Sequence, residues 1–427
     1  MNTEMIIKRI PVSELKPAKY NPRKDLKPGD PAYEKIKRSL RDFGYVDPII
    51  WNEVTGNIVG GHQRYKVLTA EGATEVDCVV VHIENPADEK ALNIALNKAT
   101  GDWEPQALAD LLLDLQDSGY DMGATGFDAA EINDLFSQVH DKEVVEDDFD
   151  IDAELEKPCF SKPGDIWHLG RHTVICGDST EPETYEKLLG DVKVNLVCTD
   201  APYFVQLKNK SGTIANDDLD DKNAYEFLMK VFTNFKNAMS KEASFYEFYA
   251  TMKTRVFYDA FEDAGFKVGA GLIWKKPRAP FMRTDWKFNM EPIIWGWRKD
   301  GKHIWYGDQK QTSVFEFDGI KDSEKEGFGH PSSKPVPLIA YLIKQCTQIN
   351  GLVLDGFLGS GSTLIACDEL DRICYGIELE PKFVDVEVMR YIAFHDGKAD
   401  DVTLTRDGKE CAFDEIEFEG REDREKE

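Results

Sequence analysis

The residues best placed to do chemistry lie in the stretch LVLDGFLGSGSTLIACDEL, where an apolar strand runs into a glycine-rich turn. The strand is predicted to end at Leu354, glycines occupy positions 356, 359 and 361, and a helix is predicted to start near Ser362. Glycines suit such a turn because a side chain would hold a ligand away from the backbone. The helix start at Ser362 and Thr363 offers unpaired N–H donors, so the turn is predicted to bind a cofactor with an anionic or carboxylate group.

A second apolar strand, RICYGIEL, brings Glu378 to its end. An acidic residue about 20 residues beyond a glycine turn is typical of sites that hold ribose hydroxyls, so the ligand is predicted to contain a ribose. The glycine order differs from the GxGxxG dinucleotide fingerprint. For this pattern alone, a structural glycine turn with a surface glutamate stays open as the alternative.

A third motif, VNLVCTDAPYF, places further reactive side chains after another buried-looking strand. The strand ends in Asp200, Ala201, Pro202 and Tyr203, so an acid, a proline and an aromatic residue follow it directly. This tetrapeptide resembles the Asp-Pro-Pro-Tyr signature of DNA amino-methyltransferases.

Other stretches resemble further landmarks of the same family. Asp355 to Gly361 is similar to its Asp-Pro-Phe-x-Gly-x-Gly motif for S-adenosylmethionine (AdoMet). Asp178 in ICGDST resembles the element that reaches the adenine of AdoMet, and HPSSKPVPLIAYLIK resembles the segment beside the methionine moiety. The resemblance implies the following cofactor-binding residues: Asp178, Lys334, Pro335, Asp355, Phe357, Gly359, Gly361, Ser362, Thr363 and Glu378.

The catalytic motif precedes the cofactor motif, which is the order found in beta-type members of the family. The resemblance extends from about Lys162 to Arg390. It implies a site-specific enzyme of phage or prophage type, of the restriction-modification kind, whose cofactor is AdoMet and which needs no metal.

The resemblance also implies a mechanism. Asp200 and the carbonyl of Ala201 would accept the two hydrogens of an exocyclic amino group and aim its lone pair at the AdoMet methyl. Because the target atom is inaccessible inside a duplex, the base must be flipped out, and Tyr203 would stack on it. Asp at the first motif position favours adenine, since cytosine-N4 enzymes usually carry Ser there. Cytosine-N4 or RNA methylation, or a catalytically weak DNA-binding regulator, stay open as alternatives.

Two positions depart from the family pattern. Ala201 replaces the first proline of the catalytic motif, and Gly356 replaces the proline of the cofactor motif. Neither change removes a functional side chain, but alanine lacks the rigidity that proline gives a loop.

These motifs need a scaffold that brings strand ends together. Short apolar runs alternate with polar turns and helical patterns, which predicts a parallel sheet covered by helices, an α/β fold of the Rossmann-like AdoMet-dependent methyltransferase kind. We predict this domain over 161–399, after an acidic, solvated linker at 139–160 and before a charged tail at 400–427 that begins with a short hairpin at VTLTRDGK.

Target recognition is predicted within 274–330, where basic residues alternate with aromatic ones. These basic residues are Lys275, Lys276, Arg278, Arg283, Lys287, Arg298 and Lys302. The alternative is that Trp286, Trp295 and Trp297 are core residues and that the charges are merely solvated.

The stretches YNPRK, SLRDFGYVDPIIW and IVGGHQRYKVL resemble successive boxes of the ParB and sulfiredoxin-like fold, so a smaller α+β domain is predicted over 1–138. Gly61, His62 and Arg64 lie between a strand and a helix, where they could hold the phosphates of a nucleotide. A helix-capping and salt-bridge role is the alternative, and the third box is divergent. No complete helix-turn-helix is predicted between Trp103 and Phe136.

Length and composition agree with two folded domains. The chain has 427 residues, of which 41% are hydrophobic, and a formal net charge of −27, which argues against non-specific coating of nucleic acid but not against a local basic cleft. Its eight cysteines are scattered singly, which predicts reduced, mostly buried thiols. Without an apolar run of membrane length we expect a cytoplasmic protein whose partner is double-stranded DNA, with a homodimer as one assembly to test.

Overall fold

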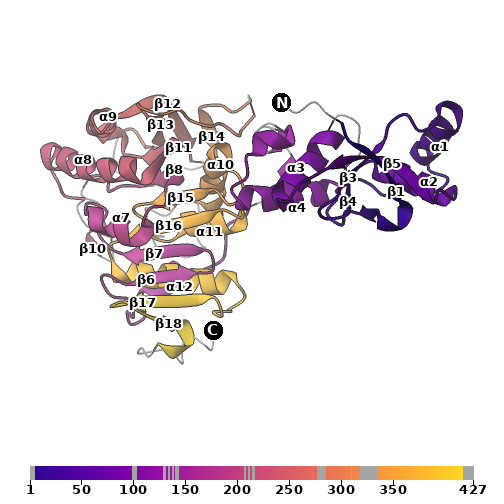
Figure 1. The fold of residues 1–427 in the computed structure, drawn as a ribbon. Helices are drawn as coiled ribbons and strands as arrows, with labels where there is room; N and C mark the ends of the chain where they lie inside the picture. Colours follow the sequence, from indigo (N-terminus) through magenta and orange to yellow (C-terminus); the bar gives the residue numbers. More distant parts are fainter. Residues whose placement is uncertain are drawn as a thin grey trace. The chain divides into compact units, whose positions relative to one another are not determined.

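The computed structural model describes residues 5–98, 103–127, 131–132, 135–136, 139, 144–205, 208–209, 212–213, 217–276, 285–308, 310–317 and 334–416. The chain divides into two compact units, Met1–Asp141 and Lys142–Glu427, and each is described by itself (Figure 1). Within the described ranges, no helix combines the length and the apolar character that a membrane span requires.

The first unit is built on a small mixed sheet. Its strand order is β1-β5-β3-β4-β2 among the described residues. The strands are β1 (Ile7–Pro11), β2 (Lys16–Pro17), β3 (Ile49–Asn52), β4 (Asn57–Gly60) and β5 (Glu75–Val81). Along β5, buried Val76, Cys78 and Val80 alternate with more exposed residues, because successive strand side chains point to opposite faces.

Helices accompany this sheet, which gives the α+β fold predicted for the front of the chain. They are α1 (Pro31–Phe43), α2 (His62–Ala70), α3 (Pro86–Asn97) and α4 (Pro105–Asp117). Helix α2 follows β4 directly, through Gly61 in a left-handed conformation. A side chain at Gly61 would also come within 3.2 Å of the backbone of Ile49, so both backbone conformation and close packing favour glycine there.

The second unit contains a sheet that has eleven strands in the described part of the chain. The order across it is β14-β12-β13-β11-β8-β15-β16-β7-β6-β17-β18. In chain order the strands are β6 (Ile166–Leu169), β7 (His172–Cys176), β8 (Val194–Thr199), β11 (Met239–Phe248), β12 (Phe266–Lys275), β13 (Met290–Arg298), β14 (Val314–Glu316), β15 (Leu352–Asp355), β16 (Ile373–Glu378), β17 (Val402–Arg406) and β18 (Lys409–Ala412). A two-stranded ribbon, β9 (Lys208–Asn209) with β10 (Gly212–Thr213), follows the catalytic motif.

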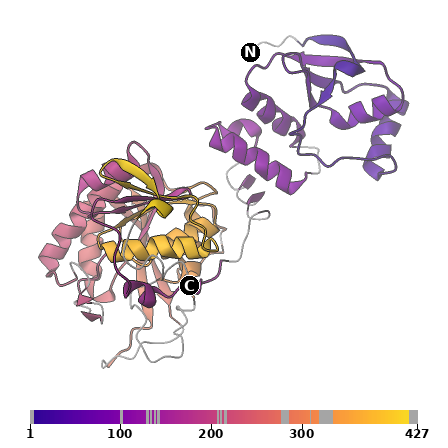
Figure 2. The same ribbon diagram turned by 90° about the horizontal axis from the view of Figure 1, so that it is seen from below.

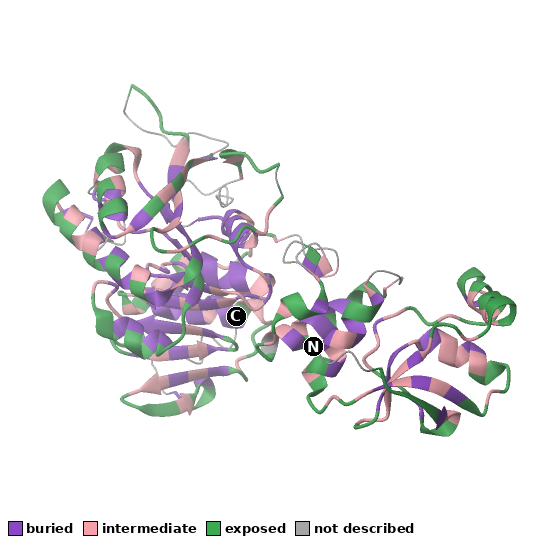
Figure 3. Cartoon of the chain, turned by 45° about the horizontal axis from the view of Figure 1, so that its top comes forward, coloured by how far each residue is buried: buried purple, intermediate pink, exposed green. Residues whose placement is uncertain are grey.

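Helices cover both faces of the large sheet, and the buried residues form a core on each face (Figures 2 and 3). One core is formed with α7 (Pro182–Leu189), α8 (Asp221–Ala238) and α9 (Thr254–Asp263). The other is formed with α10 (Val336–Cys346), α11 (Ser362–Glu369) and α12 (Pro381–Phe394). This confirms the predicted Rossmann-like arrangement of a sheet between helix layers.

The centre of the sheet is parallel. Strands β11, β8, β15, β16 and β7 are neighbours that all run in the same direction. The chain leaves β8 toward β11 on one side and leaves β15 toward β16 on the other, so the connections diverge between β8 and β15. Ligands of such sheets bind beyond the carboxyl ends of the strands at this switch point.

The acidic segment before the second unit differs from the solvated linker predicted over 139–160. Arg390 of α12 is almost fully buried, and its guanidinium lies 2.8 Å from Asp147 and 3.3 Å from Glu146. Asp385 of α12 accepts hydrogen bonds from the backbone N–H groups of Phe160 and Ser161. The expectation of a solvated linker therefore fails at Glu146 and Asp147, because these two carboxylates pair with a buried arginine, whereas Asp148, Asp150, Asp152 and Glu156 are exposed.

The predicted boundary at 399 is also too early. The hairpin predicted at VTLTRDGK forms, but its strand β17 pairs with β6 and so extends the large sheet. Arg406 in β17 forms an ion pair with Asp165, which is almost completely buried. The fold thus continues past residue 399 through β17 and β18, and 417–427 lie outside the described residues.

Replacing Arg390 by methionine should detach the acidic segment, because two carboxylates would lose their buried cation and the cofactor loop would lose a donor. We expect the free energy of unfolding of the second unit to fall by about 3 kcal/mol, and amide hydrogen exchange in 144–160 to accelerate. Arg255→Met is the matched control, since its guanidinium is 94% exposed and its ion pair with Asp259 contributes less than about 1 kcal/mol. Unchanged exchange in 144–160 would contradict this account.

Candidate active site

The candidate site lies beyond the carboxyl ends of β8, β15, β16 and β7. Strand β8 ends just before Asp200, β15 ends at Asp355, β16 ends at Glu378, and Asp178 follows β7. These positions come from distant parts of the sequence, and the parallel sheet places them at one edge.

Asp355 fastens the two motif-bearing strands together. Its carboxylate accepts hydrogen bonds of 2.6 Å from the hydroxyls of Thr199 and Thr363, and one of 3.0 Å from the N–H of Phe357. Thr199 ends β8 and Thr363 lies in the first turn of α11. Burial raises the pKa of Asp355, while these hydrogen bonds act in the opposite direction. Asp355 therefore sets the spacing between the catalytic motif and the glycine loop.

The glycine loop approaches the ligand side with its backbone. Gly359 and Gly361 have φ angles of +57° and +82°, a left-handed conformation that strongly favours glycine. Among the described residues, a Cβ placed on Gly359 would meet only the carbonyl of Phe357, at 3.8 Å, so a ligand could lie against this backbone. At Gly361 the space is lined by Glu387, 3.5 Å from the Cβ position, which is an ordinary contact distance, so the left-handed φ angle is the reason for glycine there.

Glu378 is held beside this loop by the backbone. It accepts hydrogen bonds from the N–H groups of Gly359 at 2.9 Å and Glu380 at 2.8 Å. Burial raises the pKa of Glu378 to about 7. A carboxylate has more acceptor positions than these two bonds use, so ribose hydroxyls could still donate to it.

The remaining predicted cofactor residues lie around the same edge. Asp178 accepts a hydrogen bond of 2.8 Å from the N–H of Thr180, and the preceding Gly177 N–H donates to the carbonyl of Glu378. Pro335 is the residue before α10, whose first N–H, from Val336, donates to Glu146. The acidic segment is thus fastened to the cofactor side of the site as well as to Arg390.

Lys334 lies against the catalytic motif rather than only beside the cofactor loop. Its buried ammonium forms an ion pair with Oδ2 of Asp200 and lies 3.4 Å from Oε2 of Glu291. It also lies 5.3 Å from the ring centroid of Tyr203, over the ring face. The cofactor role implied for Lys334 stays a prediction, while the observed contact is with the acid.

The catalytic motif presents one unused acceptor. Oδ1 of Asp200 is buried and has no hydrogen-bond partner among the described residues. Burial raises the pKa of Asp200 to about 6, with Lys334 opposing the rise. The hydroxyl of Tyr203 donates to Glu291 at 3.1 Å, which fixes the orientation of the ring.

Phe204 ends this loop with an aromatic anchor. Its φ angle is +56°, which costs an L-residue about 1–2 kcal/mol. Its ring is buried and packs 5.9 Å from Phe227 and 5.8 Å from Phe257, centroid to centroid. Aromatic burial thus offsets the strain that turns the chain away after Tyr203.

Two acids of the site escaped the sequence analysis. Glu247 in β11 is fully buried and accepts a hydrogen bond of 3.2 Å from the N–H of Ala201. Glu291 in β13 binds Tyr203, Lys334 and Lys276. Each is a single acid inside an apolar strand, SFYEFY and MEPIIW, and that isolation was the signal that could have identified them.

The predicted recognition stretch is only partly described. Arg278 and Arg283 lie outside the described residues, and Lys275, Lys276 and Arg298 are ion-paired with acids. Of the three tryptophans offered as core, Trp286 is 85% exposed and Trp297 is half-buried, whereas Trp295 packs against the core. DNA contact by this stretch stays a prediction.

The residues predicted to hold a nucleotide in the first unit have protein partners. Nε2 of His62 accepts a hydrogen bond of 3.3 Å from the N–H of Ala18, and burial lowers the pKa of His62 to about 4. Arg64 forms an ion pair with Asp47 and also donates to its carbonyl. Nucleotide binding at Gly61, His62 and Arg64 stays a prediction.

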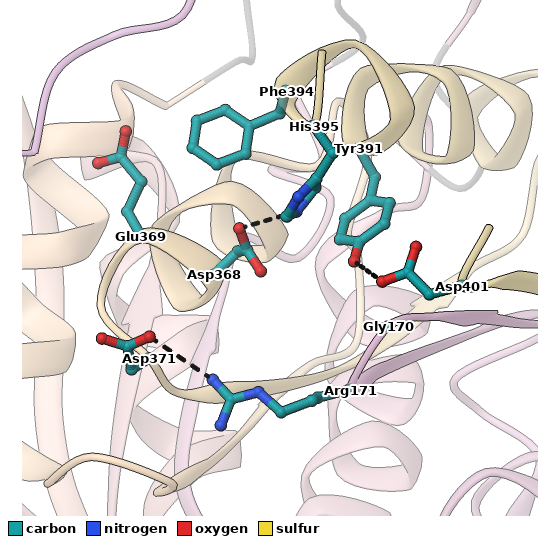
Figure 4. Close-up of a pocket in the computed structure, with 9 residues that line it drawn as sticks. All are labelled: Gly170, Arg171, Asp368, Glu369, Asp371, Tyr391, Phe394, His395 and Asp401. Carbon is teal, nitrogen blue, oxygen red and sulfur yellow. Dashed lines mark hydrogen bonds and ion pairs between the residues drawn. The ribbon is translucent and has the colours of Figure 1, made fainter. Parts of the chain in front are cut away.

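A pocket of about 580 Å³ lies away from the candidate site, where strands such as β7 and β16 begin (Figure 4). Its residues include Gly170, Arg171, Asp368, Glu369, Asp371, Tyr391, Phe394, His395 and Asp401. Asp368 lies 3.0 Å from Nε2 of His172 and 3.1 Å from Nε2 of His395, and Tyr391 donates to Asp401. These contacts join β7, α11 and α12, which is a packing role.

The predicted chemistry of the cysteines fits the structure. All eight are unbridged thiols, and six of them are buried. No cluster of potential metal ligands occurs within the described ranges.

A Rossmann-like sheet with an acidic motif at its switch point and a glycine loop beside it is typical of proteins that bind a nucleotide-type cofactor. Comparison with known families gives the class: the DNA methylase family matches residues 194–389. The ParB N-terminal domain family matches residues 1–99, and the ParB-methyltransferase HTH domain family matches 106–163. The last match corrects the expectation that the segment after Trp103 contains no complete helix-turn-helix.

Individual relatives agree with this class. The chain is 30% identical over 190 residues to the putative methylase YubD of Escherichia coli (strain K12), covering 44% of this chain and 76% of that one. It is 28% identical over 234 residues to the type II methyltransferase M2.MboI of Moraxella bovis, covering 47% and 81%. The solved M1.HpyAVI–SAM complex overlaps 51% of this chain and 98% of its own, with 23% identity and a TM-score of 0.40.

The chain therefore belongs to the N6/N4 DNA methylase family, with ParB-type domains fused in front. AdoMet is its cofactor and DNA is its partner.

The structure explains why alanine at position 201 is compatible with this site. Proline has no N–H, so Ala201→Pro would leave buried Glu247 without the hydrogen bond it now accepts. We expect Ala201→Pro to lower the free energy of unfolding by about 1–3 kcal/mol. In a Glu247→Leu background, where no acceptor remains, most of this loss should disappear. An equal loss in both backgrounds would assign the effect to the fit of the proline ring.

Gly356 has a steric reason to differ from the family proline. A Cβ at this position would lie 2.5 Å from Cζ and 2.6 Å from Cε1 of buried Phe235. Gly356→Ala should therefore destabilise the protein by about 1–3 kcal/mol through overpacking. Urea unfolding of Gly356→Ala, Phe235→Leu and the double variant tests this, because the smaller leucine should absorb the added methyl. Strictly additive losses would show that the two positions do not clash.

Proposed function

We propose that this chain methylates the exocyclic N6 of adenine in double-stranded DNA at a specific sequence. The observation that carries the proposal is the acceptor pair at the end of β8. Oδ1 of Asp200 is buried without a partner among the described residues, and the carbonyl of Ala201 belongs to the next residue. An amino group has two hydrogens to donate, so this pair suits it.

The cofactor side of the site fits AdoMet. Glu378 would accept hydrogen bonds from the ribose hydroxyls, and Asp178 would face the adenine. The backbone at Gly359 leaves room for close approach, and Ser362 and Thr363 begin a helix whose N–H groups favour a carboxylate. Bound there, AdoMet supplies a sulfonium-activated methyl group, and no metal enters this proposal.

The residues of this chain would align the amino nitrogen of the base with the methyl group. Asp200 and the Ala201 carbonyl would draw the two amino hydrogens into hydrogen bonds, which directs the nitrogen lone pair toward the methyl carbon. AdoMet would supply the methyl group and leave as S-adenosylhomocysteine, and Asp200 would accept the proton that the methylated nitrogen releases. Tyr203, fixed by Glu291, would stack on the flipped base.

Asp at position 200 supports adenine over cytosine, since the resemblance associates Ser with cytosine-N4 activity. The ParB-type units in front would assist engagement of DNA, and a homodimer is an assembly that sedimentation can test.

The proposal is tested by transfer of labelled methyl groups from AdoMet to unmethylated duplex DNA, followed by nucleoside analysis. We expect N6-methyladenine with the wild type and a loss of about 100-fold or more in kcat with Asp200→Ala, because an acceptor for the amino group is removed.

Calorimetry should show that Asp200→Ala still binds AdoMet, and Asp259→Ala, at an exposed position, should behave as wild type. N4-methylcytosine as the product would overturn the adenine assignment. AdoMet binding without transfer to any DNA would favour a DNA-binding regulator instead.

A further inference from the structure

We propose that Glu291 is a positioning residue for the catalytic motif, which holds Tyr203 by its hydroxyl and shares Lys334 with Asp200 so that Oδ1 of Asp200 stays available. The inference rests on the proposed function and adds a specific role for β13, a strand that carries none of the recognised motifs.

The geometry is an alternating chain of four charges. Asp200 contacts Lys334, Lys334 lies 3.4 Å from Glu291, and Glu291 lies 2.5 Å from Lys276. Two carboxylates and two ammonium groups thus form a nearly neutral row from the end of β8 to the end of β12. All four side chains are largely removed from water, with exposures of 25% or less.

Each carboxylate oxygen of Glu291 has its own partners. Oε1 faces Lys276, whereas Oε2 lies 3.1 Å from the hydroxyl of Tyr203 and 3.4 Å from Lys334. Glu291 therefore ties the ring that would stack on the base to the ammonium that contacts the catalytic acid. Moving Glu291 would disturb both at once.

The row explains how the buried carboxylate of Asp200 can be charged and still have an oxygen available to accept a hydrogen bond. Lys334 engages Oδ2, which fixes the carboxylate and directs Oδ1 elsewhere. Burial would raise the pKa of Glu291, but Lys334 and Lys276 outweigh it and lower the pKa, so Glu291 keeps its charge. That charge holds Lys334 by a second attraction, in addition to its direct contact with Asp200.

Other groups act on Asp200 as well. The charged or titratable side chains that face it or interact with it electrostatically are Lys334, Glu291 in β13, Glu247 in β11, Tyr203 in its own loop and Cys198 in β8. Only Lys334 is a cation, whereas Glu291 and Glu247 are acids. Removing Lys334 and removing Glu291 should therefore shift the titration of Asp200 in opposite directions.

The test compares Glu291→Gln with Lys334→Met in the full chain. The carboxylate form of Asp200 accepts the amino hydrogen, so kcat should rise as pH increases through its pKa. Without the negative charge of Glu291 that pKa falls, and the acid limb of the kcat profile should move to lower pH by about one pH unit. Without Lys334 the pKa rises, and the limb should move about as far to higher pH.

A second measurement needs no turnover. Carbon-13 NMR of aspartate-labelled protein, with the Asp200 carboxyl signal assigned through Asp200→Asn, should show the same opposite shifts. Methyl transfer by the wild type without opposite shifts would overturn this inference and leave the proposed function standing. Opposite NMR shifts without any methyl transfer would sustain the charge row and overturn the proposed function.

Two variants of Glu291 separate its hydrogen bond with Tyr203 from the effect of its negative charge. Glutamine keeps an oxygen for the Tyr203 hydroxyl but alanine does not, so Glu291→Ala alone should raise KM for DNA several-fold. Glu226→Gln is the matched control, because Glu226 in α8 pairs with the neighbouring Lys222 at an exposed position and should leave both readouts unchanged. Equal KM for the alanine and glutamine variants would show that Glu291 does not hold Tyr203.

Discussion

The parallel run of β7, β16, β15 and β8 is the constraint on which the site depends. The carboxyl ends of neighbouring parallel strands lie on the same side of a sheet. The acids that follow these strands therefore lie near one another, although they are far apart in the sequence. The hydrogen bonds from Thr199 and Thr363 to Asp355 then fix the distance between two of these ends. A shift of β8 against β15 would separate the catalytic motif from the cofactor loop, because it would break these hydrogen bonds and the one from the N–H of Gly356 to Thr199.

Much of this edge could be predicted from the sequence, because its signals are local. The apolar run before Asp200, the glycine spacing after Asp355 and the helix start at Ser362 all lie where the structure has β8, β15 and α11. Glu247 and Glu291 could not be assigned in the same way. Their partners, Ala201 and Tyr203, lie far away in sequence, and only the packing of β11, β8 and β13 brings them together.

For the acidic segment, by contrast, the local sequence signal was misleading. A run of carboxylates is usually solvated, and nothing local reveals that residue 390 in α12 is a buried arginine. The same long-range pairing reconciles a formal net charge of −27 with a site meant for a polyanion. In the row from Asp200 to Lys276, two lysines match two carboxylates, so this row adds no net negative charge to the site.

Because residues in 144–160 contact α12, they belong to the shortest fragment of the chain that can fold as a methylase. A fragment cut at residue 161 would keep Arg390 but lose both of its carboxylates, and a fragment ending at 399 would strip β17 from β6 and leave Asp165 without Arg406. A methylase fragment that keeps these contacts must therefore include Glu146 at one end and Arg406 at the other. The last part of the region that matches the ParB-methyltransferase HTH family, 144–163, therefore belongs to the folding unit of the enzyme.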